Sequence, residues 1–172
     1  MSQASEPQTR SRRRLLSIWV SFSAVALGLA LAVLSYLDLI PLSYKLGPYW
    51  LNHWIGWFSL GLIIIYVPIF VVLKRRNANI YQRLMKVHEI GFIVAFMLVS
   101  VHIGSQLRRV FPPEIGTGIA AYVSLLTLVV TGIMRRNQIS ATRGTALRSI
   151  HLSMVVTFFL VIVLHVIRAF LL

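Results

Sequence analysis

The sequence predicts an all-α integral membrane protein, a bundle of five transmembrane helices. The first observation behind this prediction is composition: 58% of the 172 residues are hydrophobic and only 12% are charged, which is typical of membrane proteins. The second is that the apolar residues fall into runs of about 20 residues, the length a helix needs to cross a bilayer. The five predicted spans cover residues 15–40, 51–73, 87–106, 115–134 and 149–171.

The chain before the first span is polar and then basic, and we predict that residues 1–14 form a disordered cytoplasmic tail. The apolar run that follows is too long for the core of a signal peptide, so we expect it to be retained as the first helix. Residues 15–172 then form a single five-helix transmembrane domain. The absence of cysteine excludes disulfides, thiolate ligands and cysteine-bound iron–sulfur clusters.

The loop after the first span carries the features of a membrane interface. The first helix ends near Asp38, where Pro41 stops it, and an aromatic belt follows. The belt consists of Tyr49, Trp50, Trp54 and Trp57. His53 lies within the belt, where interfacial hydrogen bonding is its expected role. Pro68 lies inside the second span, where membrane helices tolerate proline.

Basic residues are divided unequally between the two sides of the five-span arrangement. One side holds Arg10, Arg12, Arg13 and Arg14, then Lys74, Arg75, Arg76, Arg83 and Lys86, then Arg135, Arg136, Arg143 and Arg148. The other side holds only Lys45, Arg108, Arg109 and Arg168. The positive-inside rule then predicts that the N-terminus lies inside and the C-terminus outside. We expect a multi-pass protein of a prokaryotic plasma membrane. The net charge of +13 therefore indicates topology and contact with anionic lipid, not nucleic acid.

Two of the predicted spans carry histidines at the same spacing. His88 and His102 lie in the third span and His151 and His165 in the fifth, and each pair occupies positions i and i+14. Over this spacing a helix rises about 21 Å and stops about 40° short of a whole number of turns, so both histidines of a span share one face. The third and fifth spans run in the same direction. His88 and His151 therefore share the inner level, and His102 and His165 share the outer level.

Polar groups inside a membrane are costly and tend to be functional. A flat iron tetrapyrrole takes one axial ligand from each side, and imidazole is a good iron ligand. We therefore predict two heme b groups clamped between the third and fifth spans. His88 and His151 would bind the inner iron, and His102 and His165 the outer iron. Structural histidines, a proton relay and other metals are the alternatives.

This histidine pattern resembles the diheme b-type membrane cytochromes. These include cytochrome b of the quinol–cytochrome c reductases and the ferric-reductase-like transmembrane domain of NADPH oxidases and ferric reductases, in which two helices each supply two histidines at such a spacing. The resemblance implies that the four histidines occupy the ligand positions, and their place on the third and fifth spans is more similar to the ferric-reductase-like group. The resemblance covers the last three spans. A sixth span, a flavin and NADPH domain and the Pro-Glu-Trp-Tyr run of cytochrome b have no counterpart in the 172 residues.

Six further residues are candidates for contacts with the hemes. Gly118 and Gly132 in the fourth span share the i and i+14 spacing, at which these families let a porphyrin press on a helix backbone. Small residues are also ordinary points of helix packing, so both interpretations stay open. Four arginines near the histidines are candidates for bidentate pairing with heme propionates, with plain topology charges as the alternative. They are Arg108, Arg109, Arg148 and Arg168.

The sequence thus predicts transmembrane electron transfer by a cytochrome b subunit of a larger membrane redox complex, rather than a self-sufficient enzyme. The expected partners are redox subunits on the cytoplasmic or outer face and membrane lipid, with a quinone as a candidate. Glu89 and Glu114 are candidate proton carriers or plain interfacial acids. Two alternatives remain. One is a quinol-linked membrane anchor of a hydrogenase or molybdenum-type oxidoreductase, and the other is a heme-free transporter or assembly factor with structural histidines.

Overall fold

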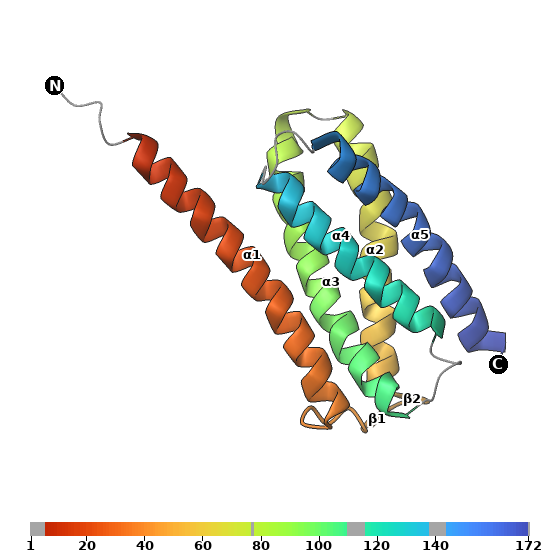
Figure 1. The fold of residues 1–172 in the computed structure, drawn as a ribbon. Helices are drawn as coiled ribbons and strands as arrows, with labels where there is room; N and C mark the ends of the chain where they lie inside the picture. Colours follow the sequence, from red (N-terminus) through yellow and green to blue (C-terminus); the bar gives the residue numbers. More distant parts are fainter. Residues whose placement is uncertain (1–5, 77, 110–115, 138–143, 172) are drawn as a thin grey trace.

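The computed structural model describes residues 6–76, 78–109, 116–137 and 144–171, which form five long helices (Figure 1). They are α1 (Glu6–Tyr36), α2 (Leu51–Arg76), α3 (Tyr81–Arg109), α4 (Gly116–Arg136) and α5 (Gly144–Leu171). A 3₁₀ helix, η1 (Ala78–Ile80), precedes α3, and the strands β1 (Lys45–Leu46) and β2 (Tyr49–Trp50) form an antiparallel hairpin before α2. Each long helix contains a stretch long and apolar enough to cross a membrane. The predicted helical bundle of a multi-pass membrane protein is therefore confirmed.

The two ends of the bundle differ in what they carry. We call the end with the β1–β2 hairpin the hairpin end. We call the opposite end the basic end, because α2 and α4 finish there with Lys74, Arg75, Arg76, Arg135 and Arg136. α1, α3 and α5 run from the basic end to the hairpin end, and α2 and α4 return (Figure 1). The helices that carry the histidine pairs are therefore parallel, as the sequence predicts.

The first helix begins earlier than the sequence predicts. α1 starts at Glu6, so residues 6–14, expected as part of a disordered tail, are helical; residues 1–5 lie outside the described residues. The expectation rested on charge, but arginine is a good helix former and the adjoining apolar helix supplies the nucleus for extension. At its other end α1 stops at Tyr36, and Asp38 takes a φ of 61°. This left-handed conformation is usual just after a helix C-terminus.

α1 packs along α3 through small residues. A Cβ atom added at Gly28 would lie 2.4 Å from the Phe96 ring, and one added at Gly104 would lie 2.1 Å from the carbonyl oxygen of Ala32. Such close backbone approach is typical of helices that associate within a bilayer. The N-terminal part of α1 extends away from the other helices (Figure 1). The C-terminal half of α1 therefore attaches it to the bundle.

The predicted aromatic belt gathers at the hairpin end. The ring centroid of Tyr49 lies 6.1 Å from that of Trp54 and 5.5 Å from that of Trp57. The indole Nε1–H of Trp54 donates a hydrogen bond of 2.8 Å to the carbonyl oxygen of Leu46. The belt thus ties the hairpin to the first turns of α2.

Apolar packing fills the bundle between the two histidine levels. Phe96 and Leu125 are fully buried, and Phe96 stacks on Tyr122 with ring centroids 5.5 Å apart. Ala95 of α3 and Phe158 of α5 belong to the same buried cluster. Each stands midway between the two histidines of its own helix, nearly two full turns from either. An apolar residue therefore occupies the middle of each histidine-bearing face and separates the two levels.

Candidate heme-binding site

Both histidines of α5 are bonded to threonines of α4. Nδ1 of His151 lies 2.9 Å from Oγ1 of Thr131, and Nδ1 of His165 lies 3.1 Å from Oγ1 of Thr117. The two threonines have the same sequence spacing as the two histidines. α4 therefore repeats one contact at two levels of the membrane.

The hydrogen bonds also fix the proton position on two of the rings. Nδ1 of His102 lies 2.9 Å from the carbonyl oxygen of Asn52 on α2, and a carbonyl can only accept, so this Nδ1 carries the hydrogen. The hydroxyl of Thr131 donates its single hydrogen to the carbonyl oxygen of Thr127 at 2.7 Å, so it accepts from Nδ1 of His151. In both rings Nε2 keeps its lone pair. This is the tautomer in which metal-bound histidines are usually held by their second shell of hydrogen bonds.

His88, at the basic end of α3, is held differently. Its ring centroid lies 4.6 Å from that of Phe70 and 4.6 Å from that of Phe92. Its buried Nδ1 has no hydrogen-bond partner among the residues that the structure describes. An unsatisfied buried polar group of this kind costs about 1–3 kcal/mol. Aromatic packing, rather than a polar bond, therefore orients this ring.

The four histidines form two pairs, one at each level. His88 interacts electrostatically with His151, and His102 with His165. These electrostatic neighbours agree with the predicted levels, and the binding of one iron by each pair stays a prediction. Within the described ranges α4 packs against both α3 and α5, whereas the backbones of α3 and α5 make at most marginal contact. The two members of each pair therefore come from helices that do not pack closely against each other.

Glycines make room for three of the imidazole rings. A Cβ added at Gly118 would lie 3.2 Å from Cε1 of His165, and one added at Gly132 would lie 3.6 Å from Cε1 of His151. Gly56 of α2 was not predicted from the sequence; a Cβ there would lie 2.9 Å from Cε1 of His102. The two predicted glycines therefore lie against the histidines themselves. Their contact with a porphyrin remains a prediction.

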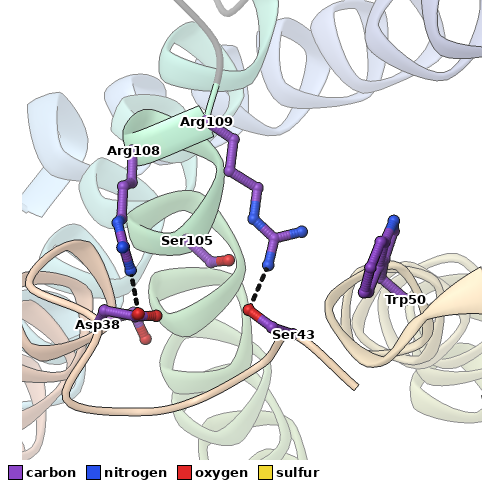
Figure 2. Close-up of a pocket in the computed structure, with 7 residues that line it drawn as sticks. Asp38, Ser43, Trp50, Ser105, Arg108 and Arg109 are labelled. Atoms are coloured by element: carbon purple, nitrogen blue, oxygen red, sulfur yellow. Dashed lines mark hydrogen bonds and ion pairs between the residues drawn. The ribbon is translucent and has the colours of Figure 1, made fainter. Parts of the chain in front are cut away.

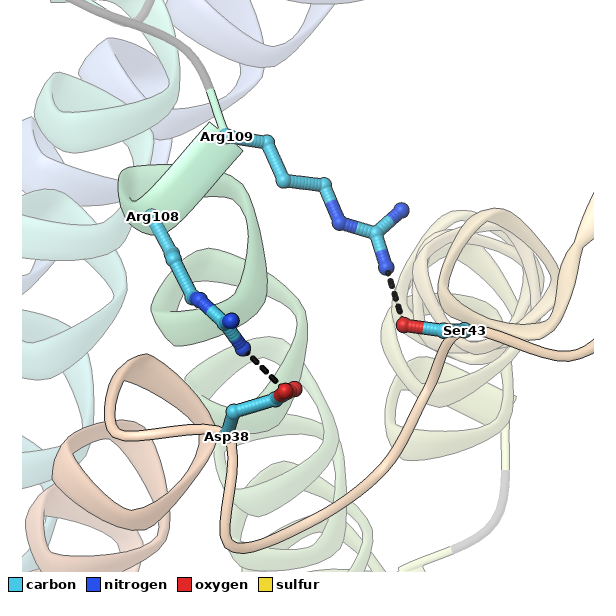
Figure 3. A network of polar contacts seen from close by, with 4 residues as sticks. All are labelled: Asp38, Ser43, Arg108 and Arg109. Carbon is cyan, nitrogen blue, oxygen red and sulfur yellow. Dashed lines mark hydrogen bonds and ion pairs between the residues drawn. The ribbon is translucent and has the colours of Figure 1, made fainter.

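The four arginines assigned to propionates lie in different surroundings. Arg108 forms an ion pair with Asp38, and Nη2 of Arg109 donates a hydrogen bond of 3.1 Å to Oγ of Ser43 (Figure 3). Both side chains therefore reach toward the connection between α1 and α2. Arg148 is exposed near the start of α5, and Arg168 is half-buried near its end.

The remaining candidates are placed as follows. Glu89 forms an ion pair with Arg136 of α4, which joins α3 to α4 at the basic end. Glu114 lies outside the described residues. His53 contacts the ring of Tyr49 at a centroid distance of 6.2 Å, and it interacts electrostatically with His102.

The donor set suits a group that takes two protein ligands. Among the residues described, no three His, Cys, Asp or Glu side chains gather into a metal-ion site. Nδ1 of three rings is held by a neighbouring helix, and no hydrogen bond joins Nε2 of these rings to another described residue. Two such imidazoles at each level fit the axial ligation of a heme iron. The fold and this site define a multi-pass helical membrane protein with two level-matched histidine pairs. No family model, curated protein or solved structure matches the chain.

Proposed function

We propose that this protein transfers electrons across a membrane through two b-type hemes, each held between one histidine of α3 and one of α5. One observation carries the proposal: two pairs of imidazoles lie at two levels, with Nδ1 anchored in three rings and with no hydrogen bond from Nε2 to another described residue. A heme with both axial positions occupied supplies a one-electron carrier with no open site at the metal.

The surrounding residues orient the ligands and keep the levels apart. Thr117, Thr131 and the carbonyl of Asn52 hold three rings. Thr131 and the Asn52 carbonyl accept from Nδ1, so they also raise the basicity of Nε2 of His151 and His102. Ala95 and Phe158 fill the space between the levels with apolar atoms, which excludes water from the middle of the bundle. The pairs are separated by about 21 Å along the helices.

We further propose that the basic end faces the cytoplasm, because most basic residues lie on that side. Electrons would then pass between carriers on opposite faces, supplied by partner subunits or by a quinone. Arg148 and Arg168 are the proposed propionate partners. Arg108 is less suited to this role, since Asp38 already neutralises it.

Heme analysis of the purified chain tests the proposal. Pyridine hemochrome measurement should give two b hemes per chain. His88→Ala and His151→Ala should each remove one redox component, and His102→Ala and His165→Ala should each remove the other. His53→Ala is the matched control and should retain both. If His88→Ala and His165→Ala removed the same component, the proposed pairing would be wrong.

A heme-free structural role is the second candidate, because three of the histidines already join neighbouring helices through Nδ1. Under this role the chain purified from heme-replete cells carries no heme absorption. His151→Asn, whose short side chain can still donate to Thr131, would then leave the thermal unfolding of the protein nearly unchanged. Two hemes per chain would exclude this candidate.

A further inference from the structure

An open pocket of about 490 Å³ lies at the hairpin end (Figure 2). It is formed by the end of α1, the connection that follows, β2 and the last turns of α3. Its lining consists of Ser35, Asp38, Ser43, Trp50, Ser105, Arg108 and Arg109. These side chains are all polar or aromatic, and they lie at the depth of the aromatic belt, where lipid headgroups meet water.

The pocket has a net positive charge that is concentrated on one side chain. Asp38 neutralises Arg108, whereas the only polar contact of Arg109 within the described chain is the hydroxyl of Ser43 (Figures 2 and 3). The guanidinium carbon of Arg109 lies 5.5 Å from the ring centroid of Trp50. A guanidinium has five N–H donors, so most of the donors of Arg109 remain available to a ligand.

A second group in the pocket lacks a partner. Ser35 is only 2% exposed, and its Oγ is buried without a hydrogen-bond partner among the described residues. α3 approaches this part of α1 closely, since a Cβ added at Gly104 would lie 2.9 Å from the Cβ of Ser35. A buried hydroxyl without a partner is costly. An oxygen-rich ligand in the pocket would satisfy it.

We propose that this pocket binds an oxyanion, a phosphate or carboxylate group, through the guanidinium of Arg109 and the hydroxyl of Ser35, beside Trp50. Arginine recognises both groups through paired N–H donors. The phosphodiester of a lipid headgroup and a small anion from the aqueous phase share this chemistry. The proposal uses none of the four histidines, and it gives Arg109 a ligand other than the heme propionate that the sequence analysis considered for it.

The test is a titration of the full-length chain with inorganic phosphate, followed by tryptophan fluorescence. The chain is first purified in an uncharged detergent and depleted of lipid, and phosphate should change the fluorescence in a saturable manner. Arg109→Gln should weaken phosphate binding about tenfold or more, because it removes a charged hydrogen-bond donor. Ser35→Ala should weaken it by a smaller factor.

Lys45→Gln is the matched control. Lys45 carries the same charge at the same end and lies 5.2 Å from the centroid of Trp50, but it does not line the pocket, so phosphate affinity should be unchanged. Thermal unfolding with and without phosphate provides a second readout. Phosphate should raise the unfolding temperature of the wild type and of Lys45→Gln more than that of Ser35→Ala, even if Arg109→Gln folds poorly.

Repeating the titration in two backgrounds identifies the source of the oxyanion. In phosphatidylglycerol nanodiscs, loss of the phosphate response assigns the site to a lipid headgroup, and its persistence assigns the site to a soluble anion. In heme-loaded chain the response should match that of heme-free chain. Loss of the response on heme loading would identify the oxyanion as a propionate and would overturn the proposal. Equal affinity of the wild type and Arg109→Gln, an equal defect in Lys45→Gln, or no phosphate response in detergent would also overturn it.

Discussion

The two histidine pairs are held in different ways. At the hairpin end both rings are bonded through Nδ1, His102 to α2 and His165 to α4. At the basic end only His151 is bonded, and His88 lies between two phenylalanine rings with its Nδ1 unsatisfied in the described chain. Hydrogen bonds fix the direction and the tautomer of a ring, whereas aromatic packing fixes mainly its plane. Hydrogen bonds therefore orient both imidazoles at the hairpin end and only one imidazole at the basic end.

The largest effect should follow from filling the space beside His102. Gly56→Leu places a Cβ 2.9 Å from Cε1 of the ring, so the imidazole must move and its bond to the Asn52 carbonyl must break. We expect loss of the hairpin-end heme with retention of the basic-end heme, measured by redox titration. Gly61→Leu on the same helix is the control, because no atom lies within 4 Å of a Cβ at that position. Loss of both hemes in Gly56→Leu alone would indicate global disruption instead.

Removing the threonine hydrogen bonds should have a smaller effect on heme affinity, and the size of this effect should differ between the two levels. Thr117→Val and Thr131→Val remove one hydrogen bond to Nδ1 while keeping the shape of the side chain. Loss of such a second-shell partner typically costs about 10- to 100-fold in metal affinity. Thr131→Val should cause the larger loss, because the basic end then keeps no bonded ring. Hemin titration of the heme-free variants measures both affinities. A larger loss of heme affinity in Thr117→Val would show that the hairpin end, not the basic end, depends more on its threonine.

The smallest effect should come from adding single methyl groups on α4. A Cβ at Gly118 would lie 3.2 Å from His165, closer than most Cβ contacts, whereas 3.6 Å at Gly132 is an ordinary van der Waals distance from His151. Gly118→Ala should therefore weaken heme binding at the hairpin end a few-fold, and Gly132→Ala should be nearly neutral. Midpoint potentials and heme content of the two variants provide the measurement. Equal effects would show that α4 and α5 adjust their separation freely at both levels.

Helix number, helix direction and the two histidine levels could be predicted from the sequence because they depend on local periodicity. Apolar runs define the spans. The i and i+14 spacing places His88 and His102 on one face of a helix, independently of how that helix packs. The charged start of α1 was less predictable, since a polar composition fits both a disordered tail and a helix extension. Residues 6–14 continue the apolar helix that follows them.

The neighbours of the histidines were harder to predict, because they depend on which helices pack together. Thr117 and Thr131 stand directly before the two glycines that the spacing singled out, so the repeated Thr-Gly pair was the available signal. Asn52 gave no comparable signal, because it contacts His102 through its backbone carbonyl, which every residue has. The directions of Arg108 and Arg109 had no such signal. They are set by the contact of α3 with the connection after α1.

The position of α5 has a consequence for biogenesis. A multi-pass chain is inserted into the membrane in the order of its synthesis, and each of the two histidine pairs takes its second member from α5. A nascent chain that ends after α4 therefore contains His88 and His102 but neither complete pair. Because α5 is already bonded to α4 through Thr131 and Thr117, its docking delivers both missing histidines together. We therefore expect neither level to be complete before α5 is inserted.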